Sequence, residues 1–273
     1  MYVILTHDVD WPLHGPGRKH VLERLDRFDE SVRRRILYEG FNPYFGIPFV
    51  IEAEERVGVK STFFFRPVYD DGTLVDCYAE VLKELVKSGW EVGVHLNSTE
   101  SLERVKLEKR LVEETAGARV VGARVHYLRI RREDYRNLHQ AGILYDSSIK
   151  KLKDRIEIDD TGYTVIHGVI VFPITIMDAY LFTYMKLSED KVLSTVLDSL
   201  LKLKEKGVEY VTILWHDNAI LMKGGRLYPK IIEELASIED IDLIKGVDAY
   251  KTVVKQEQEY WRRGEGSNLR PPG

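Results

Sequence analysis

Short apolar runs alternate with amphipathic helical stretches along most of this chain, and this alternation constrains its fold more than any other feature. The first run, residues 2–5, is aliphatic and β-branched and predicts a buried strand. Further predicted strands lie at 59–67, 90–98, 118–129, 143–148, 208–218 and 241–246. Strands that alternate with helices indicate an α/β fold with a parallel sheet. About seven β/α units in 273 residues approach the size of a (β/α) barrel.

Polar residues stand where several of these predicted strands end. They are Asp8 and Asp10 after the first strand, His95 after the third, Arg124 and His126 after the fourth, and His216 after a late one. Because the carboxyl ends of parallel strands share one rim, we expect these side chains to gather there. Carboxylate and imidazole groups at one point predict a divalent-metal site, for which zinc suits the mixed oxygen and nitrogen ligands.

The spacing within the first strand adds detail. Asp8 and Asp10 are two residues apart, so on an extended segment they point the same way, whereas His7 faces away from them. Two adjacent acids repel each other unless a cation or a shared proton lies between them. The alternative is a solvated strand end in which one aspartate caps the following helix. His216 follows Trp215, and an imidazole at such a position could donate a proton.

Residues 12–50 form the longest interruption of the alternating pattern. A turn-rich loop precedes a charged helical stretch at 18–40, and two prolines with a glycine end it near 43–48. We expect this helical insertion over the strand end that carries Asp8 and Asp10, either as a partial lid or as a packed extra helix. The Gly- and Pro-rich residues 264–273 predict a disordered tail, which leaves 1–263 as a single domain.

Composition excludes several classes of protein. A net charge of −4 gives no electrostatic reason to expect a nucleic-acid partner. The single Cys77 excludes an internal disulfide framework and favours a reducing compartment. No apolar run approaches 18 residues, and no basic segment followed by an apolar one begins the chain. We therefore expect a cytoplasmic protein with no membrane partner. The sequence does not indicate an oligomeric state.

Five segments in chain order give the sequence a family resemblance. They are LTHDVD, EVGVHLNS, GARVHYLR, FPITIMDAYLF and ILWHDN, and together they span residues 3 to about 218. The chain resembles the polysaccharide deacetylases, the NodB-homology enzymes of carbohydrate esterase family 4. It looks closest to a branch with HYLR and LWH segments. The resemblance implies a distorted (β/α)7-type barrel with parallel strands, in agreement with the alternation of strands and helices.

The resemblance also implies roles for the residues at the strand ends. Asp8 matches the catalytic base that activates water, and Asp10 matches the aspartate that binds the metal. His95 matches the first histidine ligand, and Arg124 matches the arginine that holds the base carboxylate.

Two further residues match the acid side of the family's site. His216 matches the acid that protonates the leaving amine. Asp178, in the segment after Pro173, matches the aspartate that orients this histidine. A metal would polarise the amide and lower the pKa of water, while base and acid flank the bond to be cleaved.

The sequence departs from the family pattern at one metal ligand. The second histidine normally lies four residues after the first, and Thr99 occupies that position. His126, at the end of the next predicted strand, is our hypothesis for the replacement, on the basis of its position. Otherwise the site would hold a metal with two protein ligands and waters, or hold none.

These observations predict a metal-dependent hydrolase that cleaves a C–N amide bond, most simply by deacetylation of an N-acetylated sugar or polysaccharide. Zinc is the expected cofactor, with cobalt as an alternative, and the expected partner is a carbohydrate or another small amide substrate. One alternative is hydrolysis of another linear or cyclic amide. A second is a catalytically inert barrel that binds carbohydrate or a small molecule after loss of part of the metal site. Loops 11–50 and 147–172 would set the substrate.

Overall fold

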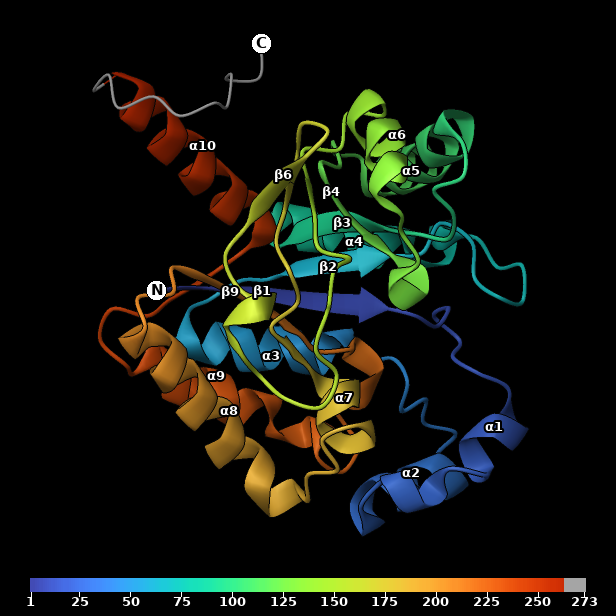
Figure 1. Cartoon of the computed structure of the whole chain (residues 1–273). Helices are drawn as coiled ribbons and strands as arrows, with labels where there is room; N and C mark the ends of the chain where they lie inside the picture. Colours follow the sequence, from blue (N-terminus) through green and yellow to red (C-terminus); the bar gives the residue numbers. More distant parts are fainter. Residues whose placement is uncertain (263–273) are drawn as a thin grey trace.

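The computed structural model describes residues 1–262, so the tail predicted at 264–273 lies outside the described residues. Its strands form one ten-stranded sheet (Figure 1). The strands are β1 (Tyr2–Val9), β2 (Thr62–Phe65), β3 (Glu91–Leu96), β4 (Gly122–Val125), β5 (Tyr145–Asp146), β6 (Thr164–Ile166), β7 (Val169–Val171), β8 (Ile176–Met177), β9 (Tyr210–Leu214) and β10 (Asp242–Ile244).

The strands follow the order β6-β7-β5-β4-β3-β2-β1-β9-β8, and β10 pairs with the start of β1. Every pairing is parallel except that of β6 with β7, which are joined by a hairpin at His167 and Gly168. The sheet curls into a half-barrel, and the predicted distorted barrel with parallel strands is thereby confirmed.

Most of the helices pack on the outer side of the sheet, but the last one, residues 246–262, packs on the inner side, where Ala249 and Val253 join the core around Ile4. The helices are α1 (Arg18–Leu22), α2 (Glu30–Tyr38), α3 (Ile47–Val57), α4 (Ala79–Lys87), α5 (Leu102–Ala116), α6 (Tyr135–Gln140), α7 (Asp178–Thr183), α8 (Glu189–Glu205), α9 (Tyr228–Ala236) and α10 (Gly246–Arg262). Helix α9 packs against α3 and α8, and α5 packs against α4 and α6. Within residues 1–262, none of the helices has the length and apolar character that crossing a membrane would need.

Residues of β1 alternate between the outer and the inner face of the sheet, and this alternation determines which way its polar side chains point. Val3, Leu5 and Val9 point outward into the large core between the sheet and the helices. Ile4 points inward, where it joins a smaller core with Phe64. Because side chains alternate along a strand, Asp8 and Asp10 continue the inward series. His7, on the outward series, is fully buried and points away from both acids, as predicted.

The insertion is helical, but the single helix expected over 18–40 is wrong. The chain forms α1, a short 3-10 turn and then α2, because Phe28 leaves the helical path in an extended conformation. Phe28 is buried and pairs as a β-bridge with Met222, and Asp29 then caps α2 by accepting a hydrogen bond from the Val32 N–H. This pairing docks the insertion against the segment that follows His216.

Gly46 fixes the other end of the insertion. A Cβ at this position would lie 1.8 Å from the Asp217 carbonyl oxygen, so only glycine permits this close approach. The Gly46 N–H also donates a hydrogen bond to the Asp217 carboxylate at 3.1 Å. The insertion therefore contacts the segment after β9 both in its middle, at Phe28, and near its end, at Gly46.

Candidate metal centre and active site

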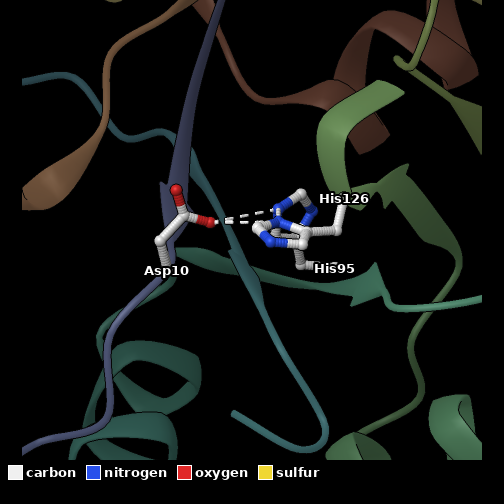
Figure 2. A group of neighbouring side chains, drawn as sticks. All are labelled: Asp10, His95 and His126. Atoms are coloured by element: carbon white, nitrogen blue, oxygen red, sulfur yellow. Dashed lines mark hydrogen bonds and ion pairs between the residues drawn. The ribbon is translucent and has the colours of Figure 1, made fainter. Parts of the chain in front are cut away.

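Three side chains from three strand ends converge on one point at the rim. Figure 2 shows ring nitrogens of His95 and His126 directed at one carboxylate oxygen of Asp10. Asp10 Oδ1 lies 3.3 Å from His95 Nε2 and 3.4 Å from His126 Nδ1. The two ring nitrogens are 3.0 Å apart. One atom from each side chain thus forms a nearly equilateral triangle.

Two sides of the triangle have the length that a tetrahedral metal site requires, and the third, between the two ring nitrogens, is shorter at 3.0 Å. Ligand atoms bound to zinc at about 2.0–2.2 Å in a tetrahedron lie about 3.3–3.5 Å from one another. Asp10 Oδ1 is buried and has no hydrogen-bond partner among the described residues, which is costly for a carboxylate oxygen unless a cation binds it. Although burial disfavours ionisation, the two histidines hold the pKa of Asp10 well below its usual value. The donor set therefore fits a divalent ion.

The surrounding backbone holds the two histidines in place. His95 Nδ1 lies 3.1 Å from the Arg124 carbonyl oxygen, so it donates its proton there and leaves Nε2 as the free ligand atom. His126 opens a turn in which Tyr127 and Leu128 have φ of 58° and 56°. Left-handed backbone costs about 1–2 kcal/mol per non-glycine residue, and such strain clusters at functional sites. His126 Nε2 is buried with no partner within residues 1–262.

Thr99 lies away from this triangle. Its hydroxyl donates a hydrogen bond to Asp134 at 3.0 Å, and Asp134 is in turn bound by Arg131. Thr99 is buried and anchors the loop after β3 to the segment before α6. Thr99, at the position of the family's second histidine, therefore stabilises this loop and does not point a ligand atom at the triangle.

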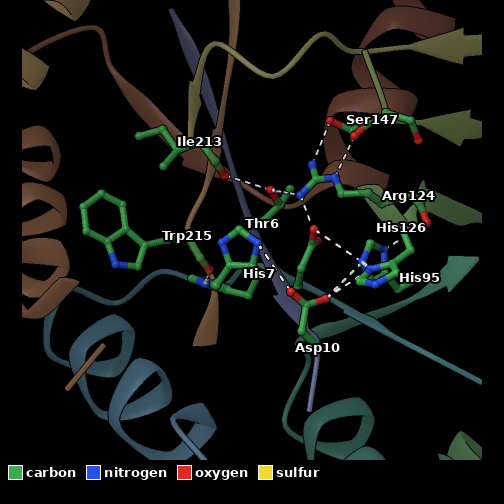
Figure 3. Close-up of polar contacts among 12 residues, drawn as sticks. Thr6, His7, Asp10, His95, Arg124, His126, Ser147, Ile213 and Trp215 are labelled. Carbon is green, nitrogen blue, oxygen red and sulfur yellow. Dashed lines mark hydrogen bonds and ion pairs between the residues drawn. The ribbon is translucent and has the colours of Figure 1, made fainter. Parts of the chain in front are cut away.

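Asp8 lies beside the triangle and is paired with the buried Arg124. Figure 3 shows Arg124 between Thr6 and Ser147. The Arg124 guanidinium donates to Asp8 Oδ1 at 3.0 Å and to the Thr6 hydroxyl at 3.0 Å. It also donates to the Ser147 carbonyl oxygen at 2.6 Å and to its hydroxyl at 2.8 Å. With Arg124 held from two sides, one carboxylate oxygen of Asp8 is fixed and the other lies 3.7 Å from His95 Nε2.

His216 closes the other side of the site. Its Nδ1 lies 2.7 Å from Asp178 Oδ1, and its backbone N–H donates to Asp178 Oδ2 at 2.9 Å. Its Nε2 faces Asp10 Oδ2 at 3.7 Å. Burial alone would lower the pKa of His216, but the Asp178 carboxylate, helped by Asp10 and Asp8, raises it to about 10. His216 can therefore carry a proton at neutral pH.

Sequence reasoning missed two polar residues near this site, Asp217 and Tyr69. Asp217 Oδ1 and the Tyr69 hydroxyl are buried and have no hydrogen-bond partner among the described residues. Burial raises the pKa of Asp217 to about 8, and the charge of Asp10 adds to the effect. Burial also raises the pKa of Tyr69, with contributions from Asp217 and Asp10. Asp217 could have been found from the sequence, because it is a polar residue directly after His216. Tyr69 lies in a loop that contains no motif, so no sequence signal indicated it.

No protein-family model and no curated protein matches this sequence. Solved structures match its fold. A protein assigned as a polysaccharide deacetylase from Mycobacterium smegmatis has a TM-score of 0.65 at 18% identity, over 100% of this chain and 94% of its own. The Puue allantoinase has a TM-score of 0.63 at 16% identity, over 92% of this chain and 89% of its own.

A third match comes from a protein described as inactive. A CE4 family pseudoenzyme from Bacillus anthracis has a TM-score of 0.50 at 14% identity, over 91% of this chain and 65% of its own. The resemblance predicted from the motifs is confirmed at the level of the fold, because this chain has the fold of the polysaccharide deacetylases. Since hydrolases and a pseudoenzyme share that fold, activity has to be argued from the site.

Proposed function

We propose that this chain, which has the polysaccharide deacetylase fold, is a metal-dependent hydrolase of C–N amide bonds. The observation that carries the proposal is the triangle of Asp10, His95 and His126, with Asp8 on one side and His216 on the other. The simplest reaction is deacetylation of an N-acetylated sugar or polysaccharide. We also propose that residues 1–263 act as one domain, with the insertion at 12–50 beside the site.

Asp10, His95 and His126 would hold the metal, and their mixed oxygen and nitrogen donors favour zinc, with cobalt as an alternative. When bound, the ion supplies Lewis acidity, which polarises a carbonyl group and lowers the pKa of water. In this proposal His126, at the end of the next strand, provides the second histidine ligand that Thr99 cannot provide.

Asp8 is the proposed general base. Its carboxylate lies beside the proposed ligands, and the hydrogen bond from Arg124 holds it in one orientation. An ionised carboxylate can accept a proton from the attacking water. Arg124 has no access to solvent, so its role is to position Asp8.

His216 is the proposed general acid. Asp178 binds its Nδ1, which leaves Nε2 toward the site and stabilises the protonated ring. Cleavage of an amide expels a poor leaving group unless its nitrogen gains a proton, and His216 Nε2 can supply that proton. Asp8 and His216 thus flank the metal triangle as base and acid.

A second candidate is hydrolysis of a cyclic amide, which the TM-score of 0.63 to an allantoinase favours. A third is an inert barrel that binds carbohydrate or a small molecule, and the pseudoenzyme with a related fold, together with Thr99, motivates it. The first candidate cleaves a linear amide, the second opens a cyclic amide and the third cleaves no bond. A hydrolysis assay with two substrates therefore distinguishes them.

The test is hydrolysis by zinc-loaded protein of two probes, N-acetylglucosamine oligomers and allantoin. Acetate release from the oligomers that is lost after chelation and restored by zinc supports the deacetylase. Metal-dependent ring opening of allantoin alone supports the cyclic-amide alternative. Reproducible absence of metal from protein purified without chelator, together with no turnover of either probe, contradicts the hydrolase and favours the inert barrel.

A further inference from the structure

A second polar cluster lies behind the site, on the outward face of β1. Glu54 of α3 is its centre, and the side chains of His7, Ser61, Trp90 and Tyr228 surround it. Glu54 and His7 have no exposed side-chain surface. A carboxylate in the core is costly unless donors compensate it, so the contacts of this group need an explanation.

Donors satisfy both oxygens of Glu54. Oε1 accepts a hydrogen bond from the Tyr228 hydroxyl at 2.7 Å and lies 3.0 Å from His7 Nε2. Oε2 accepts from the Ser61 hydroxyl at 2.9 Å and from Trp90 Nε1 at 2.6 Å. The cluster joins α3, α9 and the residues before β2 and β3 to the outward side of β1.

His7 extends the cluster to β9. Its Nδ1 lies 2.7 Å from the Trp215 carbonyl oxygen. A carbonyl oxygen only accepts, so Nδ1 carries the proton and donates it there. His7 directly precedes the proposed base Asp8, and Trp215 directly precedes the proposed acid His216.

The hydrogen bond from His7 lies where the backbone pairing of the two strands ends. The pairing of β1 with β9 runs to Thr6 and Leu214, and the Trp215 N–H then donates to the Thr6 carbonyl oxygen at 3.0 Å. The register of β1 with β9 ends at this pair. The His7 side chain supplies the next link between them, and Glu54 fixes the His7 ring.

We propose that Glu54 and His7 form a positioning pair that sets the end of β1 relative to the end of β9. The pair thereby fixes Asp8 and Asp10 relative to His216 from behind the sheet. The catalytic consequence rests on the proposed function of those residues, whereas the coupling between the strand ends stands without it. Neither Glu54 nor His7 contacts substrate in this account, so both are positioning residues.

The chain offers a matched control in Glu91, the first residue of β3. Its carboxylate is also buried and accepts hydrogen bonds from the Thr62 hydroxyl at 2.7 Å, the Tyr145 hydroxyl at 2.8 Å and the Val247 N–H at 2.8 Å. Glu91 lies at the start of β3, at the opposite end of the strand from His95, and the hydrogen bonds to its carboxylate come from β2, β5 and the start of α10. The substitution Glu91→Gln therefore imitates the loss of a buried carboxylate without touching the proposed link.

The experiment compares Glu54→Gln with Glu91→Gln in the full chain. We expect both variants to lower the melting temperature. Only Glu54→Gln should shift the backbone amide NMR resonances of Asp10 and His216 in metal-free protein, because only this change releases His7. It should also weaken zinc binding, measured by chelator competition, by up to about tenfold, the lower end of the loss seen when a direct partner of a metal ligand is removed, because His7 acts on Asp10 only through the backbone. Glu91→Gln should leave the resonances and the zinc affinity unchanged.

Two results overturn the proposal: Glu54→Gln that leaves both amide resonances in place, or Glu91→Gln that shifts them equally. If Glu54→Gln fails to fold, Tyr228→Phe removes one donor from Glu54 and keeps the carboxylate. It should shift the same two resonances by less, and unchanged resonances would again overturn the pair. If wild-type protein binds no zinc, the proposed function fails, while the amide shifts still decide the coupling.

Discussion

The two faces of β1 carry polar clusters that differ in one respect. On the outward face, both oxygens of the Glu54 carboxylate have partners. On the inward face, Asp10 Oδ1 is buried without a hydrogen-bond partner among the described residues, although two ring nitrogens surround it. β1 supplies His7 to the outward cluster, and Asp10, directly after its last residue, belongs to the inward one.

This difference indicates which of the two clusters can bind a metal ion. A closed set of hydrogen bonds needs no further partner and stabilises position. An incomplete set made of a carboxylate and two imidazoles has a place for a cation. We therefore propose that the outward cluster stabilises the framework and that the inward cluster binds the metal.

The largest effect should follow substitution of the proposed base on the inward face. Asp8→Asn keeps the shape of the side chain but removes the charge that accepts a proton. We expect a loss of about 10²–10⁴-fold in kcat on the substrate found in the hydrolysis screen, with zinc content retained. Metal analysis and steady-state kinetics on the same sample measure both quantities.

The same substitution at Asp240 provides the control, because Asp240 is exposed and lies at the opposite end of β1. Asp240→Asn should leave kcat unchanged. Hydrolysis that persists in Asp8→Asn would show that another group acts as the base.

A smaller effect on rate, with a large effect on stability, should follow loss of Arg124. Arg124→Gln leaves the buried Asp8 carboxylate without its cation, and breaking a buried ion pair costs about 3–5 kcal/mol. Chemical denaturation measures the change in the free energy of unfolding. Arg155→Gln removes an exposed arginine whose partners Asp154 and Glu157 are also exposed, and it should cost less than about 1 kcal/mol. Equal losses in the two variants would contradict the role of Arg124.

The smallest effect concerns pH and His216. Its folded-state pKa of about 10 exceeds its usual value of 6.5, so its protonated form stabilises the fold. That contribution is complete below about pH 6.5 and is lost as pH rises through about 10. The melting temperature of metal-free wild type should therefore fall across this range more than that of His216→Gln. Parallel curves for the two proteins would indicate that His216 has no raised pKa.

Alternation along the strands allowed much of the site to be predicted. The spacing of Asp8 and Asp10 indicated that both face one way and His7 the other, and the structure has this arrangement. The apolar runs that precede His95 and His216 predicted strand ends at the same rim. These predictions needed only the period of a strand and the rule that parallel strands end together.

The remaining features depend on contacts between residues that are distant in the sequence. The break at Phe28 arises from its bridge to Met222, which no local pattern in the insertion reveals. Glu54 looks like any charged residue of an amphipathic helix until Tyr228 and Trp90 pack around it. The ligand geometry of His126 likewise requires the turn at Tyr127 and Leu128, whose positive φ angles are unusual for these residue types.

The most direct test of the central claim is zinc binding by His126→Ala, compared with Thr99→Ala. The account predicts that wild type and Thr99→Ala each bind one zinc ion with similar affinity, because Thr99 contacts Asp134 and no ligand. His126→Ala should bind zinc more than about 100-fold more weakly in chelator competition, because it loses one of three protein ligands. Full zinc affinity in His126→Ala, or its loss in Thr99→Ala, would contradict the assigned metal centre.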